Sequence, residues 1–319
     1  MVSVVGIKGS IKTVRALDKG LARHNDSLTI VEDIESDTVK NADAFIQTNL
    51  IKPKIANSPS RREAYQHILY SKKPFLVIES PVFRQYTNLK YTRLGWWSYK
   101  WTDGDFNNTN SPSDRWNKFQ KESGIQIKDW HSPGNAILIM GQKEGDSSLN
   151  LIYERYKSFY DWVADTIIEI RKYSDRPIII RPHPRNLKHG ISLANKLSKK
   201  YKNIKVSDNV QNVPEEQVRL LGHMDNEEGL KKDFAQSYCV VTYNSLSGVE
   251  AVCEGLPTFA LDDGSMVWPV THHNLADLEN LNYNMDRTQW CNDVAYTHWT
   301  AKENRKGESW AHLKPVFFD

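Results

Sequence analysis

The 319-residue chain has 39% hydrophobic and 25% charged residues, which is typical of a soluble globular protein. No apolar run approaches twenty residues, which excludes a transmembrane helix. Its length predicts two domains. The net charge is only +3, but residues 51–100 carry ten Lys and Arg against two acidic residues. Such a basic block is either a solvated surface or a footprint for a polyanion.

The first residues and the cysteines of the sequence indicate the cellular compartment. The first ten residues resemble a first β-strand rather than a secretory signal. The three cysteines, Cys239, Cys253 and Cys291, lack metal-binding spacing, which indicates a reducing compartment. We therefore expect a cytoplasmic protein that does not insert into membranes. The sequence does not indicate an oligomeric state.

The first half alternates short apolar runs with helical patterns. Strands are expected at residues 2–5, 28–31, 44–47 and 75–78, and helices at residues 11–21 and 61–70. This alternation predicts a parallel sheet with both faces covered. Residues 86–133 interrupt the pattern, because they are rich in Asn, Ser, Gly, Asp and aromatic residues with little periodicity. Residues 132–134, Ser-Pro-Gly, form a plausible linker.

A second alternating series follows the linker. Strands are expected at residues 136–140, 177–180, 204–206, 239–242 and 258–261, with a long helix over 153–173 and shorter helices at 192–201 and 231–237. Residues 286–319 have the pattern of polar, Trp-bearing helix. Two α/β halves are thus predicted.

Three loops of the second half follow expected strands, where open α/β sheets bind ligands. The first, at residues 141–148, offers small residues, Gln142 and Ser147 to a ligand, although it could equally be a polar turn. The second, Arg-Pro-His-Pro-Arg, aims Arg181, His183 and Arg185 from a backbone stiffened by two prolines. These basic side chains suit phosphate oxygens.

The third loop, residues 243–251, runs from a strand into a helix. It carries the predicted donor-binding residues Asn244, Ser245, Ser247, Gly248 and Glu250. A helix start with serine hydroxyls can bind an anion, and Glu250 could accept hydrogen bonds from ribose hydroxyls. Alternatively, a serine caps the helix and Glu250 complements its dipole.

As a set, the motifs GQKEGDSS, RPHPR and NSLSGVEAVCEGLPTF over residues 136–262 resemble the C-terminal half of GT-B glycosyltransferases, in particular the capsule polysaccharide branch. The resemblance implies an α/β fold of two Rossmann-like domains facing across a cleft. It assigns an acceptor domain to residues 1–133, with helices 286–319 packing back on it, and a nucleotide-sugar domain to residues 134–285. It also implies that Arg181, His183, Ser245 and Ser247 contact the donor phosphate and that Glu250 holds the ribose.

Two further stretches, NNTNSPSDRW and the tail from Asp286 to Trp310, resemble phage glycosyltransferases that modify hydroxymethylated bases in DNA. The expected co-substrate is a UDP- or CMP-linked sugar. We expect no obligatory metal, because no donor strand carries an Asp-x-Asp motif. Asp103 and Asp105 have that spacing but lie in the presumed acceptor half.

Direct sugar transfer requires a base for the acceptor hydroxyl. Glu79, at the end of the strand at 75–78, is the favoured candidate, and Asp103 and Asp105 are rivals. Glu79 could instead be a strand-end acid paired with Arg84 or a lysine, and Asp114 and Arg115 are expected to form a structural ion pair. DNA as acceptor would account for both features, because the basic block could bind phosphates and a tryptophan of the aromatic loop could stack on an extruded base or act as a wedge in the space that the base leaves. The acceptor-binding candidates are Lys72, Lys73, Arg84, Arg93, Trp96, Trp97 and Trp101.

Other acceptors and activities remain open. A capsule or cell-surface glycan would explain the aromatic residues, and an anionic glycan would explain the basic block as well. A UDP-sugar epimerase of the same fold would bind the same donor but would need paired acids in its cleft. A non-catalytic nucleic-acid-binding protein would need the basic block without the donor loops.

Overall fold

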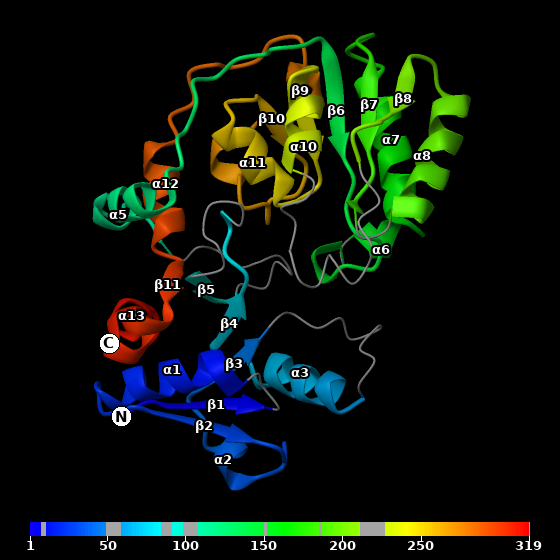
Figure 1. Ribbon diagram of the computed structural model, residues 1–319. Helices are drawn as coiled ribbons and strands as arrows, with labels where there is room; N and C mark the ends of the chain where they lie inside the picture. Colours follow the sequence, from blue (N-terminus) through cyan, green and yellow to red (C-terminus); the bar gives the residue numbers. More distant parts are fainter. Residues whose placement is uncertain are drawn as a thin grey trace. The chain divides into compact units, whose positions relative to one another are not determined.

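The computed structural model describes residues 1–7, 11–48, 59–83, 91–97, 108–149, 152–184, 187–210 and 227–318. The chain forms two compact units (Figure 1). Unit 1 combines Met1–Ser123 with Cys291–Asp319, and unit 2 is Gly124–Trp290. None of the described helices combines the length and the apolar character needed to cross a membrane.

Unit 1 contains a six-stranded mixed sheet. Its strands are β1 (Ser3–Ile7), β2 (Ser27–Val31), β3 (Ala44–Thr48), β4 (Phe75–Glu79), β5 (Tyr91–Trp96) and β11 (His298–Thr300). The order is β11-β5-β4-β3-β1-β2, and the four strands from β4 to β2 are parallel. β5 runs antiparallel to β4, and β11 antiparallel to β5, so the expectation of a wholly parallel sheet is wrong at this edge. Antiparallel neighbours need no crossover helix.

Side-chain alternation along the strands of unit 1 builds a core on each face of its sheet. Val4 and Leu76 face Val14, Leu17 and Leu21 of α1 (Ile11–Ala22) on one face. Trp310 of α14 (Glu308–Leu313) belongs to this core as well. In the chain, α14 follows α13 (Ala301–Lys306) and precedes the short η6 turn (Lys314–Val316). The neighbouring residues Val5 and Val77 pack on the other face against Ala64 and Ile68 of α3 (Pro59–Ser71), beside α2 (Asp37–Lys40).

Two segments of unit 1 differ from the sequence expectation. The aperiodic region contains β5 and the helix α5 (Asp114–Ser123), whose buried Trp116 and Phe119 are three residues apart on one face. The carboxyl-terminal segment, expected as helix, contains the strand β11 between α12 (Thr288–Ala295) and α13. Three residues are too short to show strand periodicity, so only tertiary pairing with β5 reveals β11.

Unit 2 contains a wholly parallel five-stranded sheet. Its strands are β6 (Ala136–Met140), β7 (Ile178–Arg181), β8 (Ile204–Val206), β9 (Ser237–Thr242) and β10 (Thr258–Ala260), in the order β10-β9-β6-β7-β8. The central strand β6 is buried at every residue. Burial on both faces explains why these strands read as continuous apolar runs rather than alternating ones.

Helices cover both faces of this sheet. α7 (Phe159–Ile170) and α8 (Leu187–Lys200) contribute to one core with Ile137 and Ile139, while α10 (Glu227–Phe234) and α11 (Ser247–Cys253) contribute to another with Leu138 and Met140. Shorter turns are η1 (Ser147–Leu149), α6 (Ile152–Arg155), η4 (Trp268–Val270) and η5 (Leu275–Asp277).

The single helix expected over residues 153–173 is in fact two helices. Ser158 adopts an extended backbone (φ −145°, ψ 162°) and forms a capping box with Asp161, so α7 begins there and α6 ends before it. The apolar spacing of Phe159, Trp162 and Val163 continues the helical pattern. The capping signal therefore determined the boundary that periodicity alone missed.

Candidate functional site

The strand order of unit 2 identifies where a ligand should bind. β6 and β9 are neighbours, but the chain continues from β6 toward β7 on one side and from β9 toward β10 on the other. Ligands of open α/β sheets bind at the carboxyl ends of the strands at such a switch point. The loops that start here begin at Gly141 and Tyr243. We call loops 141–148, 181–184 and 243–250 the switch-point edge.

Two predicted donor-binding residues tie this edge together. The Gln142 amide Nε2 donates to Asn244 Oδ1 (2.7 Å), and the Asn244 backbone N–H donates to Gln142 Oε1 (3.1 Å). Both side chains are buried. They are therefore the braces that hold the loops after β6 and β9 in register.

Asp262 completes this brace and was missed in the sequence. Asn244 Nδ2 donates to Asp262 Oδ2 (2.8 Å) and to the Ser148 carbonyl (2.9 Å), so the orientation of its amide is fixed. Burial raises the pKa of Asp262 above its ordinary value, although hydrogen bonds from Asn244 and Tyr243 oppose the shift. The available signal was an acid two residues beyond β10, at the same edge of the sheet.

The serine pair lies beside this brace and is only partly buried. Ser245 Oγ and Ser247 Oγ lie 2.7 Å apart, and the Ser247 backbone N–H donates to Ser245 Oγ (3.2 Å). The residue at the cap position of α11 is Leu246, which makes no side-chain capping bond. Ser245 nevertheless meets part of the capping alternative, because its Oγ accepts from the backbone N–H of the first residue of α11, whereas Ser247 lies inside the helix. One hydrogen links the two hydroxyls, and the other hydroxyl hydrogen is available for an acceptor.

The basic residues at the end of β7 and in the loop that follows differ in burial and in partners. The buried Arg181 guanidinium pairs with the buried Asp233 of α10, which also accepts hydrogen bonds from Ser207 Oγ (2.6 Å) and Asn209 Nδ2 (2.7 Å). Arg181 is therefore engaged inside unit 2. His183 is partly exposed. A Cβ added at Gly141 would come within 3.0 Å of the His183 backbone nitrogen, so these two loops touch.

Fewer contacts are described for the remaining predicted donor-binding residues. Gly248 is buried, and an added Cβ would lie 3.2–3.3 Å from Val267 and Thr242 side chains, so its small size serves packing. Glu250 is partly exposed on α11. Ser147 begins η1, but its side chain and the whole of Arg185 lie outside the described residues.

Glu79, the predicted base, ends β4 in unit 1 and is half-buried. In the antiparallel register it lies opposite Arg93, which in turn lies opposite His298 of β11. Residues directly opposite on neighbouring strands project to the same face of the sheet. The three side chains therefore form one row across the edge of the sheet. The rival bases Asp103 and Asp105 lie outside the described residues.

The predicted acceptor-binding residues are mostly engaged within unit 1. Trp96 is 1% exposed and donates from Nε1 to the Leu313 carbonyl (2.8 Å), which corrects its proposed role as a wedge. Arg93 is 5% exposed, too buried for a surface phosphate clamp. Lys73 Nζ donates to the carbonyls of Lys40 (3.0 Å) and Ala42 (2.5 Å).

Of the other acceptor candidates, Trp97 is half-buried and stacks on Phe75 with ring centroids 5.6 Å apart, whereas Lys72 is exposed. Arg84 and Trp101 lie outside the described residues.

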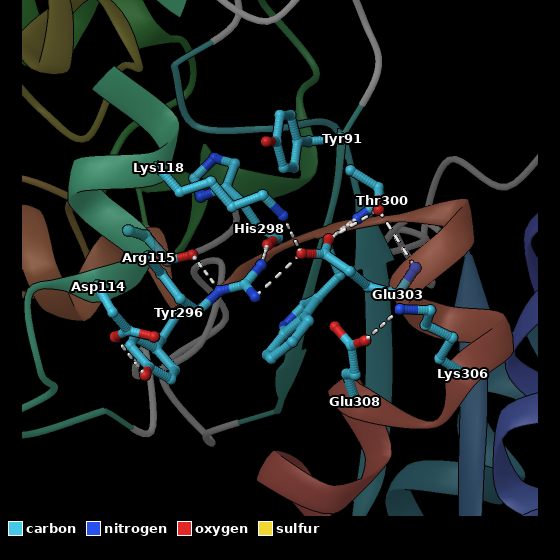
Figure 2. Close-up of polar contacts among 12 residues, drawn as sticks. Tyr91, Asp114, Arg115, Lys118, Tyr296, His298, Thr300, Glu303, Lys306 and Glu308 are labelled. Carbon is cyan, nitrogen blue, oxygen red and sulfur yellow. Dashed lines mark hydrogen bonds and ion pairs between the residues drawn. The ribbon is translucent and has the colours of Figure 1, made fainter. Parts of the chain in front are cut away.

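A polar cluster of unit 1 joins α5 to the carboxyl-terminal segment around the buried side chains of His298 and Glu303, and no motif in the sequence marks it (Figure 2). We call Arg115, Lys118, His298 and Glu303 the fastening cluster. Glu303 Oε1 accepts from Arg115 Nη1 (3.2 Å) and Lys118 Nζ (2.5 Å), while its Oε2 accepts from the Thr300 backbone N–H (2.7 Å). Although burial opposes ionisation, these donors lower the pKa of Glu303 to about 2.

His298 is neutral in this cluster. Its Nε2 accepts from the Val82 backbone N–H (2.9 Å), which leaves Nδ1 to donate to the Val294 carbonyl (2.8 Å). Burial, together with the charges of Arg93 and Arg115, lowers the pKa of His298 to about 3. The expected Asp114–Arg115 ion pair is replaced by a hydrogen bond and a different ion pair. Asp114 accepts from the Tyr296 hydroxyl (2.8 Å), and Arg115 pairs with Glu303.

No protein-family model and no curated protein matches the sequence. Among solved structures, the chain is similar to KpsC of Thermosulfurimonas dismutans, a beta-Kdo 2,7 transferase, with 11% identity and a TM-score of 0.51 over 97% of this chain and 99% of that one. A second structure, described as the beta-Kdo 2,4 transferase of KpsC from the same organism, has 14% identity and a TM-score of 0.49 over 91% and 89% of the two chains. The first likeness shows the fold, which is α/β and GT-B-like with two Rossmann-like units, as the motifs predicted.

Proposed function

We propose that this protein is a glycosyltransferase that takes a sugar from a nucleotide-activated donor held at the switch-point edge of unit 2. The observation that carries the proposal is the hydroxyl pair of Ser245 and Ser247. The Gln142–Asn244–Asp262 brace holds it where parallel sheets bind phosphorylated ligands. The fold it shares with a transferase supports the same activity.

Within this proposal, the residues of the edge divide into contacts and supports. Ser245, Ser247 and His183 would donate hydrogen bonds to the donor phosphate, and Glu250 would accept from the ribose hydroxyls. Gln142, Asn244 and Arg181 would hold the loops, since their polar atoms already bind Asn244, Asp262 and Asp233 respectively. Preorganised donors of this kind stabilise charge that develops on the leaving nucleotide. The donor would be UDP- or CMP-linked.

For the acceptor we favour a capsule or cell-surface glycan over hydroxymethylated DNA. The DNA hypothesis needed exposed cations and an exposed aromatic wedge in residues 51–100. Among the described candidates there, Arg93 and Trp96 are buried, and Lys73 is bonded to two backbone carbonyls. The motifs of unit 2 resemble the capsule branch, and the structural neighbour bears the name of a Kdo transferase.

The proposed base for the acceptor hydroxyl is Glu79. It lies at the carboxyl end of β4, where ligands of parallel strands approach, and it is half-buried beside the buried Arg93 in the same row. An ionised carboxylate at this position could remove the hydroxyl proton as the sugar carbon is attacked.

The experiment is to incubate the chain with a panel of UDP- and CMP-sugars and three acceptors, and to analyse the products by mass spectrometry. The acceptors are a neutral oligosaccharide, an anionic oligosaccharide and hydroxymethylpyrimidine DNA. Transfer to an oligosaccharide is expected. Transfer to DNA alone would support hydroxymethylated DNA as the acceptor. Conversion of the donor sugar in a reaction that contains no acceptor would indicate an epimerase. Failure of every nucleotide sugar to bind would refute the proposal.

A further inference from the structure

A basic pocket lies in unit 1 between α1 and α13. It has a volume of about 620 Å³ and is lined by Lys19, Ala22, Arg23, Lys302, Arg305 and Lys306. All five cationic side chains are exposed. None of the described residues that line the pocket is acidic, and α1 and α13 lie side by side in Figure 1.

The two helices that form this pocket are in close contact. A Cβ added at Gly20 would collide with the Asn304 carbonyl, so α1 and α13 are in backbone contact. Arg23 Nε donates to the Arg305 carbonyl (3.0 Å), and the His24 ring Nε2 lies 3.1 Å from the Gly307 carbonyl. The cations are therefore presented from a fixed backbone rather than from a loop, so little backbone entropy is lost when a ligand binds.

The charge of the pocket is not balanced by the protein. Lys306 pairs with Glu308 (3.4 Å; Figure 2), whereas the side chains of Lys19, Lys302 and Arg305 have no ion pair or hydrogen bond with any other described residue. Lys19 and Arg23 lie at the carboxyl-terminal end of α1, and Arg305 and Lys306 lie at that of α13, whereas Lys302 lies in the first turn of α13. Each carboxyl-terminal helix end supplies at most roughly half a negative charge. The two ends together offset about one cation. Of the five cations, Lys306 is paired with Glu308 and about one more is offset by the helix ends, so about three positive charges remain unbalanced.

The unbalanced positive charge of the pocket indicates which kind of ligand it would bind. A single carboxylate carries one negative charge, whereas a phosphate monoester carries about −1.5 to −2 at neutral pH. Arginine and lysine bind phosphate oxygens by charge-assisted hydrogen bonds. We propose that the pocket is a binding site for an anion that presents two or more phosphate groups, either a soluble oligophosphate or adjacent phospholipid headgroups.

The topology separates this site from the proposed base of unit 1. α1 follows β1 and ends at Ala22, just before β2 begins at Ser27, so the pocket lies at the amino-terminal edge of the parallel strands. Glu79 lies at the carboxyl-terminal end of β4. The two features are on opposite edges of one sheet, and the pocket would recruit or retain an anionic ligand rather than take part in the transfer.

The test uses the full chain, two probes and two charge-matched variants. Lys302→Glu with Arg305→Glu reverses two cations of the pocket. Lys199→Glu with Lys200→Glu makes the same charge change on exposed residues at the end of α8 in unit 2. Binding of tripolyphosphate is measured by calorimetry, and flotation with phosphatidylcholine vesicles containing phosphatidylglycerol measures headgroup binding.

We expect at least one probe to bind the wild type, and the pocket variant to bind it about tenfold more weakly or worse, since each charge-assisted hydrogen bond is worth about that factor. The α8 variant should bind as the wild type does. Loss with tripolyphosphate indicates a soluble ligand, and loss with vesicles alone indicates headgroups. Equal binding by both double variants overturns the proposal. If the pocket variant melts early, Lys302→Gln with Arg305→Gln replaces it.

Discussion

The fastening cluster of unit 1 and the switch-point edge of unit 2 both gather polar side chains, but they use them differently. In the fastening cluster, Glu303 accepts from two cations and a backbone N–H, and both ring nitrogens of His298 have backbone partners. At the switch-point edge, Ser245, Ser247 and His183 remain partly exposed. The difference teaches that satisfied, buried polar groups maintain the fold, whereas partly exposed groups supported by a buried brace are the candidates for ligand binding.

The unit 2 edge itself contains both kinds of residue. Gln142, Asn244 and Asp262 are buried and bonded to one another, while the serine pair lies at the surface of this brace. The comparison therefore predicts that variants of exposed edge residues change binding or turnover, and that variants of the fastening cluster change stability.

The largest effect is expected from the proposed base. Glu79→Gln should lower turnover by about 10²–10⁴-fold, because the amide cannot accept the acceptor's proton. The isosteric change should leave the fold and donor affinity as they are. Steady-state kinetics with separate donor titration checks this. A fully active Glu79→Gln together with an inactive Asp105→Asn would transfer the role of base to Asp105.

The next largest effect concerns stability. Arg115→Leu leaves the buried Glu303 carboxylate without one of its cations and should lower the free energy of unfolding by about 3–5 kcal/mol. The matched control is Lys306→Ala, which breaks the exposed pair with Glu308 and should cost only about 0–1 kcal/mol. Urea unfolding measures both. Equal costs for the two variants would remove the distinction between the cluster and an ordinary surface pair.

A smaller effect is expected at the switch-point edge. Ser245→Ala with Ser247→Ala, and separately His183→Ala, should weaken nucleotide-sugar binding by about 1.5–3 kcal/mol for each lost hydrogen bond to a charged phosphate. Calorimetric titration gives the affinities, and thermal unfolding should be nearly unchanged because these groups are partly exposed. Unaltered affinity in both variants would show that the phosphate lies elsewhere.

The smallest effect is a pH dependence from His298. The unfolded chain takes up a proton at this residue below about pH 6.5, but the folded imidazole stays neutral down to about 3. Its contribution is therefore complete above pH 6.5 and is lost as the pH falls. Between pH 7 and pH 5 this should cost about 2 kcal/mol. His298→Gln should flatten the loss, whereas the exposed His131→Gln should not. Parallel slopes in all three proteins would contradict the assignment.

Much of the architecture could be predicted from the sequence, because buried parallel strands leave a strong apolar signal. The strand at 136–140 was predicted to the residue, and the GT-B-like fold followed from the motifs after such strands. Strand direction could not be predicted for β5 and β11, because pairing depends on partners distant in the sequence. Asp26 is a similar case, since its carboxylate binds Val2, Trp310 and Lys314 from both ends of the chain.

The site was less predictable than the fold. Residue type and position after a strand marked Gln142, Asn244 and Ser245 as candidates, but they could not separate a brace from a ligand contact. Charge patterns were also ambiguous. A count of cations over residues 51–100 suggested a polyanion footprint, yet Arg93 is buried and Lys73 binds backbone carbonyls. The basic pocket was missed because its cations come from α1 and α13, nearly 300 residues apart.

The central claim is that unit 2 holds a nucleotide-activated sugar at its switch-point edge. The most direct test is a crystal structure of the chain soaked with the nucleotide sugar that stabilises it most in a thermal-shift screen. We predict a phosphate within hydrogen-bonding distance of Ser245 Oγ, Ser247 Oγ or His183. A nucleotide bound anywhere else, including the basic pocket of unit 1, would contradict the claim.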